Sequence, residues 1–188
     1  MKKSISLCFL AALTALSMTM SAAERGKFIH VDNSSNKNLK PQLAFCQEHK
    51  DGKDITSLLL WTVQPNTYHE FGEAARILVA FADGYKVRLN RIGGSEEKRE
   101  TYTQKASTAT IKYYKSITAY ETTPEVIEKL KNGTAITKVR VVFKENDAKD
   151  YEIAEGYQPK MAADLLKSYL EAEQKCKAAN GDLSDDDF

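Results

Sequence analysis

The two β-rich runs that flank Asp83-Gly84 constrain the fold of this chain more than any other stretch. They read RILVAFA over residues 76–82 and YKVRLNRI over residues 85–92. An Asp-Gly pair between such runs is typical of a two-residue type I′ turn. This turn would pair Ala82 with Tyr85, Ala80 with Val87 and Leu78 with Leu89 on one apolar face, and Ile77, Val79 and Phe81 with Asn90, Arg88 and Lys86 on the other. The sequence therefore predicts an antiparallel hairpin with an internal first strand.

Further strands are predicted on both sides of the hairpin, from apolar or alternating runs that are bounded by turn-forming residues. These runs cover residues 27–32, 42–47, 55–63, 108–121 and 135–143, with another short run near residues 151–153. In the run 135–143, alternation sets Phe143 and two valines on one side, opposite Lys138 and Arg140. The polar stretch 92–107 lacks this pattern, and the sequence predicts a mobile loop there.

Two helices are predicted. Thr123-Pro124-Glu125 supplies an N-cap, a first-turn proline and an early acid, and Asn132-Gly133 is suited to the end of the same helix. A longer helix over residues 159–178 has one apolar stripe, formed by Met161, Leu165, Tyr169, Ala172 and Cys176. The pattern predicts a single α+β domain over residues 23–181. Its antiparallel-rich β-sheet would carry one short helix, with a long C-terminal helix packed on it.

Residues 1–22 have the three parts of a secretory signal peptide. Lys2 and Lys3 form a positive start, residues 5–16 an apolar run, and Ser21-Ala22-Ala23 a small-residue cleavage site. The apolar run is too short to span a bilayer well, and no second run approaches that length. We therefore expect export from a bacterial cell, to the periplasm or the medium, with a mature chain that begins at Ala23 or Glu24. We expect no membrane span after signal removal and a disordered acidic tail at residues 182–188.

Two cysteines remain after removal of residues 1–22, Cys46 and Cys176. In an oxidising compartment, an even pair predicts a disulfide. Two buried free thiols are the main alternative, and the place of Cys176 on the apolar stripe of the long helix is compatible with both. A catalytic cysteine is less favoured, since His49 is not aligned with Cys46 along a strand. A zinc site lacks the paired ligand spacings of structural zinc, and the sequence predicts no metal and no cofactor.

Charge is balanced over the mature chain but unevenly distributed. The mature chain has 25 basic and 26 acidic residues, which argues against a general nucleic-acid or membrane-surface binder. Residues 76–144 carry a net charge of +7 and residues 145–188 one of −7. The predicted strands bring seven residues to outward faces as a candidate binding surface: Lys86, Arg88, Lys112, Tyr114, Tyr120, Lys138 and Arg140. This surface is either a solvated face partly neutralised by the acidic C-terminal region, or a site for an anionic glycan, an acidic peptide or a protein.

No phosphate-binding loop, nucleophile elbow or paired-histidine zinc motif occurs in the sequence. Two classes of function therefore stay open. The first is an exported non-catalytic binding or interaction module that uses the basic sheet face or the region from Trp61 to His69. The second is a hydrolase of unrecognised type that uses His69, His49 or His30 with a carboxylate. A convergent histidine–carboxylate pair in a deep pocket would favour the hydrolase, and we favour the module.

The stretch 76–144 resembles, in layout, small secreted bacterial proteins of unknown function. In these proteins a hairpin of the form ILVAFADGYKVRL precedes a helix like TTPEVIEKLKNG and then a basic strand. The resemblance implies an exported bacterial protein. It carries no functional residues over to this chain.

Overall fold

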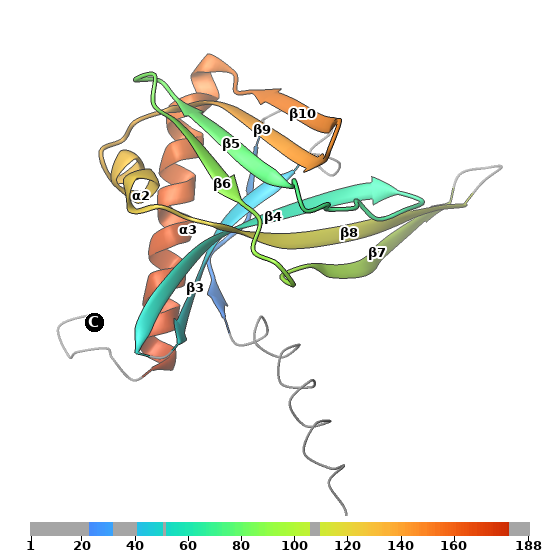
Figure 1. Cartoon of the computed structure of the whole chain (residues 1–188), viewed down its shortest axis with the longest axis horizontal. Coiled ribbons are helices and arrows are strands. Elements are labelled where there is room, and N and C mark those ends of the chain that lie inside the picture. Colours follow the sequence, from blue (N-terminus) through green and yellow to red (C-terminus); the bar gives the residue numbers. More distant parts are fainter. Residues whose placement is uncertain (1–22, 32–40, 51, 106–109, 181–188) are drawn as a thin grey trace, which may run out of the picture.

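A computed structural model of the chain describes residues 23–31, 41–50, 52–105 and 110–180. Two antiparallel sheets make up most of this part (Figure 1). The six-stranded sheet has the order β1-β3-β4-β8-β7, with β2 also paired to β3. Its strands are β1 (Glu24–Arg25), β2 (Ile29–His30), β3 (Gln42–Lys50), β4 (Lys53–Pro65), β7 (Glu97–Lys105) and β8 (Thr110–Glu121).

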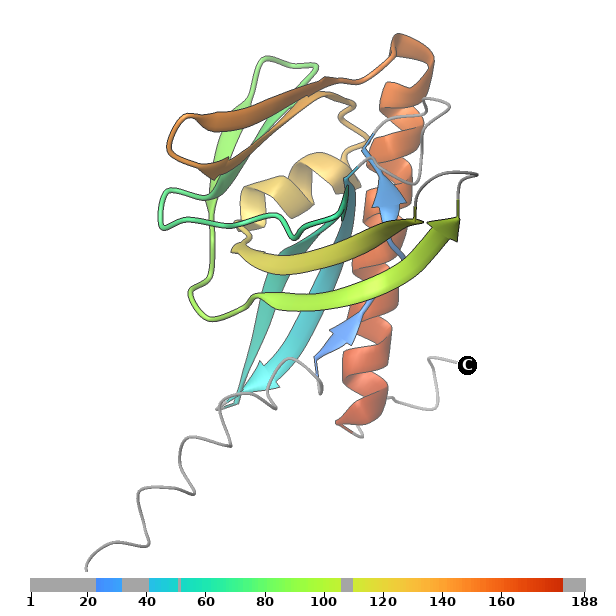
Figure 2. The same cartoon turned by 90° about the vertical axis from the view of Figure 1, so that its right-hand side faces the viewer.

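The four-stranded sheet has the order β10-β9-β5-β6. Its strands are β5 (Arg76–Phe81), β6 (Lys86–Asn90), β9 (Ile136–Lys144) and β10 (Asp147–Glu152). The helices are α2 (Pro124–Lys131), a single 3-10 turn η2 (Glu155–Tyr157) and α3 (Gln158–Ala179). Figure 2 shows the long helix α3 running past both sheets. The predicted α+β class, with one short helix and a long C-terminal helix, is confirmed, although the strands form two sheets.

The main core lies between the inner faces of the two sheets and the two helices. Phe45 and Leu60 come from the six-stranded sheet, Val141 from the four-stranded sheet, and Leu130 and Met161 from the helices. Phe45 packs edge-on against Tyr169 of α3, with ring centroids 5.7 Å apart. A smaller cluster lies on the other face of the six-stranded sheet and contains Cys46, Leu59, Ile117 and Ala119. Part of the six-stranded sheet is therefore covered on both faces.

The β5–β6 hairpin is present, but its register differs by one residue from the prediction. Val79 pairs with Val87 and Leu78 with Arg88. The turn has three residues, because the Phe81 N–H donates to the Tyr85 carbonyl at 2.9 Å. Gly84 has a φ of 86°, which is the left-handed conformation that such three-residue turns require. The predicted type I′ register is therefore wrong. Because the shift is one residue, the β5 side chains that were expected beside Val87 and Leu89 lie instead on the side of Lys86 and Arg88.

The predicted loop over residues 92–107 is also wrong in its middle part. Residues 97–105 form β7, which pairs with β8 and is an edge strand of the six-stranded sheet. Its sequence, EKRETYTQK, is charged and polar. Charged side chains are typical of edge strands, where they oppose pairing with other chains. They also hide the apolar alternation on which strand prediction depends.

Both predicted helices are confirmed, with ends within one residue or so of the expected positions. Thr123 is the N-cap residue of α2, and Gly133 follows its end with a φ of 69°. All five residues of the predicted stripe of α3 are buried: Met161, Leu165, Tyr169, Ala172 and Cys176. Ser168 is buried beside them, and its hydroxyl accepts a hydrogen bond from the Phe45 N–H at 3.0 Å.

The predicted disulfide is absent from the structure, in which Cys46 and Cys176 are both buried free thiols. Phe45 faces α3, so its neighbour Cys46 points to the opposite side of β3, into the smaller cluster. Cys176 lies on the buried stripe of α3, which packs on the side that Phe45 faces. Burial raises the pKa of the Cys46 thiol to about 11, so this thiol is protonated and unreactive at neutral pH.

We expect thiol titration of the mature protein in denaturant, without reductant, to find two free thiols per chain. The native protein should react slowly, because both cysteines are buried. Cys46→Ser should remove one of the two thiols. If the denatured, unreduced protein has no free thiol, Cys46 and Cys176 form the predicted disulfide, and β3 and α3 must be arranged differently from the structure.

The predicted signal peptide (1–22) and the predicted acidic tail (182–188) lie outside the described residues. Among the helices that are described, none combines the length and the apolar character needed to cross a lipid bilayer.

Candidate functional site

The outer face of the four-stranded sheet carries a concentration of basic side chains. Pairing across the sheet forms three rows, Glu152–Lys138–Ala80–Lys86, Asp150–Arg140–Leu78–Arg88 and Ala148–Val142–Arg76–Asn90. Side chains in such rows point to the same side of the sheet. Because Ile77, Val79 and Phe81 point into the core, these rows face outward. We define the basic face as Arg76, Lys86, Arg88, Lys138 and Arg140, with Leu78 at its centre.

The centre of the basic face combines apolar and cationic groups. Leu78 is half-buried and pairs with Arg88 on one neighbouring strand and with Arg140 on the other. Since paired strands lie about 4.8 Å apart, the backbones of these two arginines are about 10 Å apart. An open groove of about 900 Å³ runs from Leu78 towards the β9–β10 turn. Its lining includes the basic residues Arg76, Arg140 and Lys144 and, at the turn, the acidic residues Glu145 and Asp147. A ligand in this groove would contact guanidinium groups beside an apolar side chain.

Acidic residues of β10 neutralise one side of the basic face. Lys138 Nζ lies 2.7 Å from a Glu152 carboxylate oxygen and 3.4 Å from one of Asp150, and Arg140 Nε lies 3.5 Å from Asp150. On the other side, Arg88 donates to the Asn90 side chain at 3.0 Å and Arg76 to the Ala74 carbonyl at 2.9 Å. Within the described part of the chain, no carboxylate forms an ion pair with Arg76, Lys86 or Arg88. The uncompensated charge therefore lies over β5 and β6.

Four of the seven predicted surface residues lie together on the basic face: Lys86, Arg88, Lys138 and Arg140. Lys112 and Tyr114 lie on β8 in the other sheet, where the Tyr114 ring packs 4.7 Å from that of Tyr68. Tyr120 is fully buried in the main core opposite Leu58, so its predicted place on a binding surface is wrong. Burial also raises the pKa of its hydroxyl.

Arg76 is the basic-face residue that sequence reasoning missed. With the predicted type I′ register, the even-numbered residues of β5 fall on the apolar side of the hairpin. The observed register moves them to the side that Lys86 and Arg88 occupy, and Arg76 moves with Leu78 and Ala80. A three-residue turn around Asp83 is also compatible with the sequence, and only this turn would have identified Arg76.

A cleft opens where the β9–β10 hairpin meets the end of β4. Its inner part has a volume of about 230 Å³ and is walled mainly by Pro41, Pro65, His69, Phe143 and Tyr151. An outer part of about 350 Å³ includes Thr67, Glu70, Lys144 and Asp147 in its lining. Gln64, His69 and Lys149 line both parts, and we call the two together the His69 cleft.

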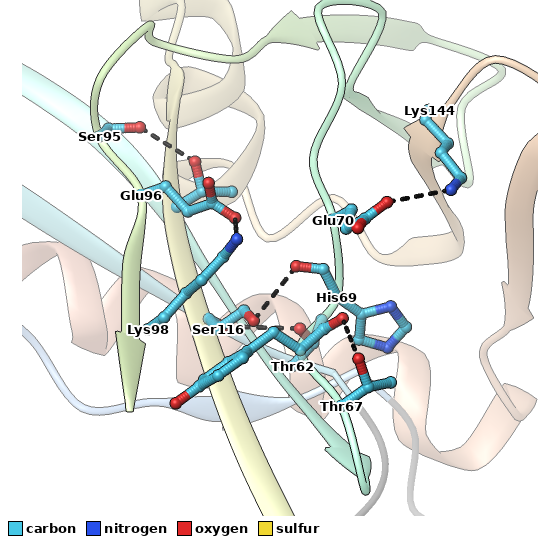
Figure 3. A network of polar contacts seen from close by, with 11 residues as sticks. Thr62, Thr67, His69, Glu70, Ser95, Glu96, Lys98, Ser116 and Lys144 are labelled. Atoms are coloured by element: carbon cyan, nitrogen blue, oxygen red, sulfur yellow. Dashed lines mark hydrogen bonds and ion pairs between the residues drawn. The ribbon is translucent and has the colours of Figure 1, made fainter. Parts of the chain in front are cut away.

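The imidazole of His69 is held flat against an aromatic core residue. Its ring stacks on Phe143 with the centroids 4.3 Å apart and an angle of 8° between the planes. The backbone is held by the Ser116 hydroxyl, which donates to the His69 carbonyl at 3.4 Å (Figure 3). The neighbouring Glu70 carboxylate pairs with Lys144 at 3.2 Å, as the same figure shows. One face of the imidazole is therefore covered by Phe143, and the ring lines both parts of the cleft.

The environment of His69 disfavours its protonated form. Burial of the ring is the main cause, and the positive charge of Lys149 adds to it, so that the pKa falls to about 4. Asp147 opposes the shift but does not cancel it. His69 is consequently neutral at pH 7.

The other two histidines lie outside the cleft lining. His49 and Asp54 face each other across the end of the β3–β4 hairpin, with Nδ1 2.8 Å from a carboxylate oxygen, and both side chains are exposed. The His30 carbonyl accepts a hydrogen bond from the Tyr157 hydroxyl. No cluster of three or more potential metal ligands is found when the described residues are searched. The histidines thus do not form one site.

Comparisons of the chain with protein-family models, with curated proteins and with solved structures find no match. The resemblance of residues 76–144 to secreted bacterial proteins stays a prediction.

Proposed function

We propose that this protein is an exported, non-catalytic binding module that holds an anionic ligand on the basic face. The observation that carries the proposal is that three neighbouring rows set Lys86, Arg88 and Arg76 on one side of the sheet, without carboxylate partners in the described residues. The signal-peptide pattern of residues 1–22 supports export. The ligand would be an anionic glycan or the acidic segment of a peptide or protein.

The chemistry of arginine supports this choice of ligand. A guanidinium group presents several N–H donors in one plane and matches carboxylate and sulfate oxygens in pairs. Leu78 adds an apolar contact between Arg88 and Arg140, which a purely electrostatic surface would lack. A ligand with two anionic groups would reach both arginines at once, since their backbones are only about 10 Å apart.

The geometry gives less support to a hydrolase. A general base acts best with a pKa near the working pH, whereas His69 has a pKa of about 4. The Ser116 hydroxyl donates to the His69 carbonyl and not to its imidazole, so it is not an activated nucleophile. The His49–Asp54 pair is exposed on a hairpin end, and neither the inner nor the outer part of the His69 cleft includes it.

We expect Arg88→Glu to weaken binding to heparin, a sulfated glycan, by about tenfold at low salt, because the substitution reverses an unpaired charge beside Leu78. The combined change of Asp150→Asn and Glu152→Gln should strengthen binding, since it frees Lys138 and Arg140. Both effects should shrink near 0.15 M salt, where the Debye length is about 8 Å. Titration calorimetry at two salt concentrations measures them.

Lys112→Glu is the matched control, because it makes the same charge change on the other sheet. It should weaken heparin binding much less than Arg88→Glu does. Equal losses from the two variants would show that net charge, and not the basic face, determines binding. Poly-glutamate in place of heparin separates an acidic peptide from a glycan as the preferred partner.

A further inference from the structure

The inner part of the His69 cleft lies on the opposite side of the four-stranded sheet from the basic face, whereas Lys144 and Asp147 of the outer part also line the groove. Lys149 and Tyr151 of β10 line the inner part, whereas their neighbours Ala148 and Asp150 belong to the outward rows. Alternation along the strand therefore directs the two sets of side chains to opposite sides. The cleft is a second site whose role does not depend on the proposed function.

The inner part of the cleft has flat, rigid walls. The stacked rings of Phe143 and His69 form one wall, and Phe143 is itself held by Phe71, with ring centroids 5.7 Å apart. Tyr151 and two prolines contribute to the rest of the lining. Because Phe143 covers one face of the imidazole, only the other face and the ring edge can meet a ligand. Such a surface suits a flat ring that continues the stack.

The charges in the cleft are arranged with one cation inside and the acids outside. Among the described residues that line the inner part, Lys149 is the only charged one, and its Nζ lies 5.9 Å from the centre of the Phe143 ring. Glu70 and Asp147 line only the outer part, where Glu70 is paired with Lys144. The neutral imidazole of His69 and the amide of Gln64 add hydrogen-bonding groups without charge. The inner part therefore suits a single negative charge next to a ring.

We propose that the His69 cleft binds a small planar ligand with one carboxylate, an aromatic acid in its simplest form. The ring stacks on the free face of His69, and the carboxylate pairs with Lys149. The inner volume of about 230 Å³ is below the usual range for drug-sized ligands, which limits the ligand to a single ring system.

Benzoate is a suitable probe, followed by NMR through the ring protons of His69 at pH 7. We expect saturable shifts with a dissociation constant in the millimolar range. Benzyl alcohol has the ring without the charge, and cyclohexanecarboxylate has the charge without a flat ring. Each should bind about fivefold more weakly than benzoate, which is the difference that one ion pair or one stacked ring makes.

Lys149→Gln should abolish the preference for benzoate over benzyl alcohol and leave the binding of the alcohol unchanged. Arg88→Glu is the control on the basic face, and it should change neither probe. Equal binding of all three probes, or benzoate binding that Lys149→Gln does not weaken, would overturn the proposal. Loss of benzoate binding in Arg88→Glu would place the probe on the basic face and would overturn it as well.

Discussion

Gly26→Ala should lower the free energy of unfolding by about 3 kcal/mol or more, and the melting temperature by roughly 10 °C. A methyl group on this residue would lie 1.8 Å from the Ser168 carbonyl oxygen. That oxygen belongs to the backbone of α3, so it cannot rotate away as a side-chain atom could. Either α3 or the segment after β1 must move, and both contribute to the main core.

The contact is close because α3 supplies a hydrogen bond to β3 where strand pairing is interrupted. The pairing of β1 with β3 stops at Arg25 and Cys46, and the pairing of β2 with β3 resumes with Ile29 and Leu43 after a shift of one residue. Between them, the Gly26 N–H still donates to the Phe45 carbonyl at 3.0 Å, but the Phe45 N–H donates to the Ser168 hydroxyl. A buried N–H needs a hydrogen-bond partner. Ser168 can provide one for the Phe45 N–H only if α3 lies directly against Gly26.

Thermal and urea unfolding of the full-length mature chain measure the effect. Gly156→Ala is the matched control, because its added methyl group would meet nothing within 4 Å, and it should change stability little. Ser168→Ala should cost about 1–3 kcal/mol, since it leaves the Phe45 N–H buried without a partner. If Gly26→Ala is as stable as Gly156→Ala, α3 does not pack against residue 26 as the structure has it.

Local sequence patterns predicted which main segments are helices and which are strands. They often did not predict the register of strand pairing or which side chains the fold covers. The alternation of β9 and the apolar stripe of α3 each predicted the buried face correctly. In both elements the side chains that face the core recur at the regular spacing of a strand or a helix. The buried Ser168 had no local signal. Its hydroxyl accepts a hydrogen bond from Phe45, at an interruption of strand pairing more than a hundred residues earlier in the sequence.

Tyr120 shows the limit of strand alternation. Alternation correctly put Tyr114 and Tyr120 on the same side of β8, but it does not say how much of that side is covered. The second sheet and its core cover the end of β8 that carries Tyr120 and leave Tyr114 half-exposed against Tyr68. The predicted outward position therefore agrees with the structure for the residues of β6 and β9 and is wrong for Tyr120.

The error in the predicted register of the β5–β6 hairpin has a similar cause, because the local sequence allows more than one arrangement. An Asp-Gly pair is compatible with turns of two or three residues, and here the Asp83 carboxylate accepts a hydrogen bond from the Tyr85 N–H at 3.0 Å. This bond favours the three-residue turn, in which Ile77, Val79 and Phe81 share the core face with Val87 and Leu89. The site residue Arg76 was missed for this reason alone.

Acid should destabilise the protein partly through His69. The pKa of His69 is about 4 in the folded chain, against 6.5 for an ordinary histidine, because the buried ring resists protonation. The unfolded chain therefore takes up this proton first as the pH falls, and proton uptake by the unfolded state lowers stability. The contribution of neutral His69 is complete above about pH 6.5 and is lost between about pH 6.5 and 4. After allowance for the solvent exposure of the ring, we expect a loss of about 1–2 kcal/mol.

His69→Phe tests this expectation, because phenylalanine keeps a ring on Phe143 and cannot take up a proton. Relative to the wild type, the variant should gain about 1–2 kcal/mol of unfolding free energy between pH 7 and pH 4, measured by urea unfolding at each pH. NMR titration of the wild type should place the midpoint of the His69 ring near pH 4. A midpoint near 6.5, together with parallel stability curves for the two proteins, would mean that the ring is open to solvent. The stacked wall of the His69 cleft would then not exist in solution.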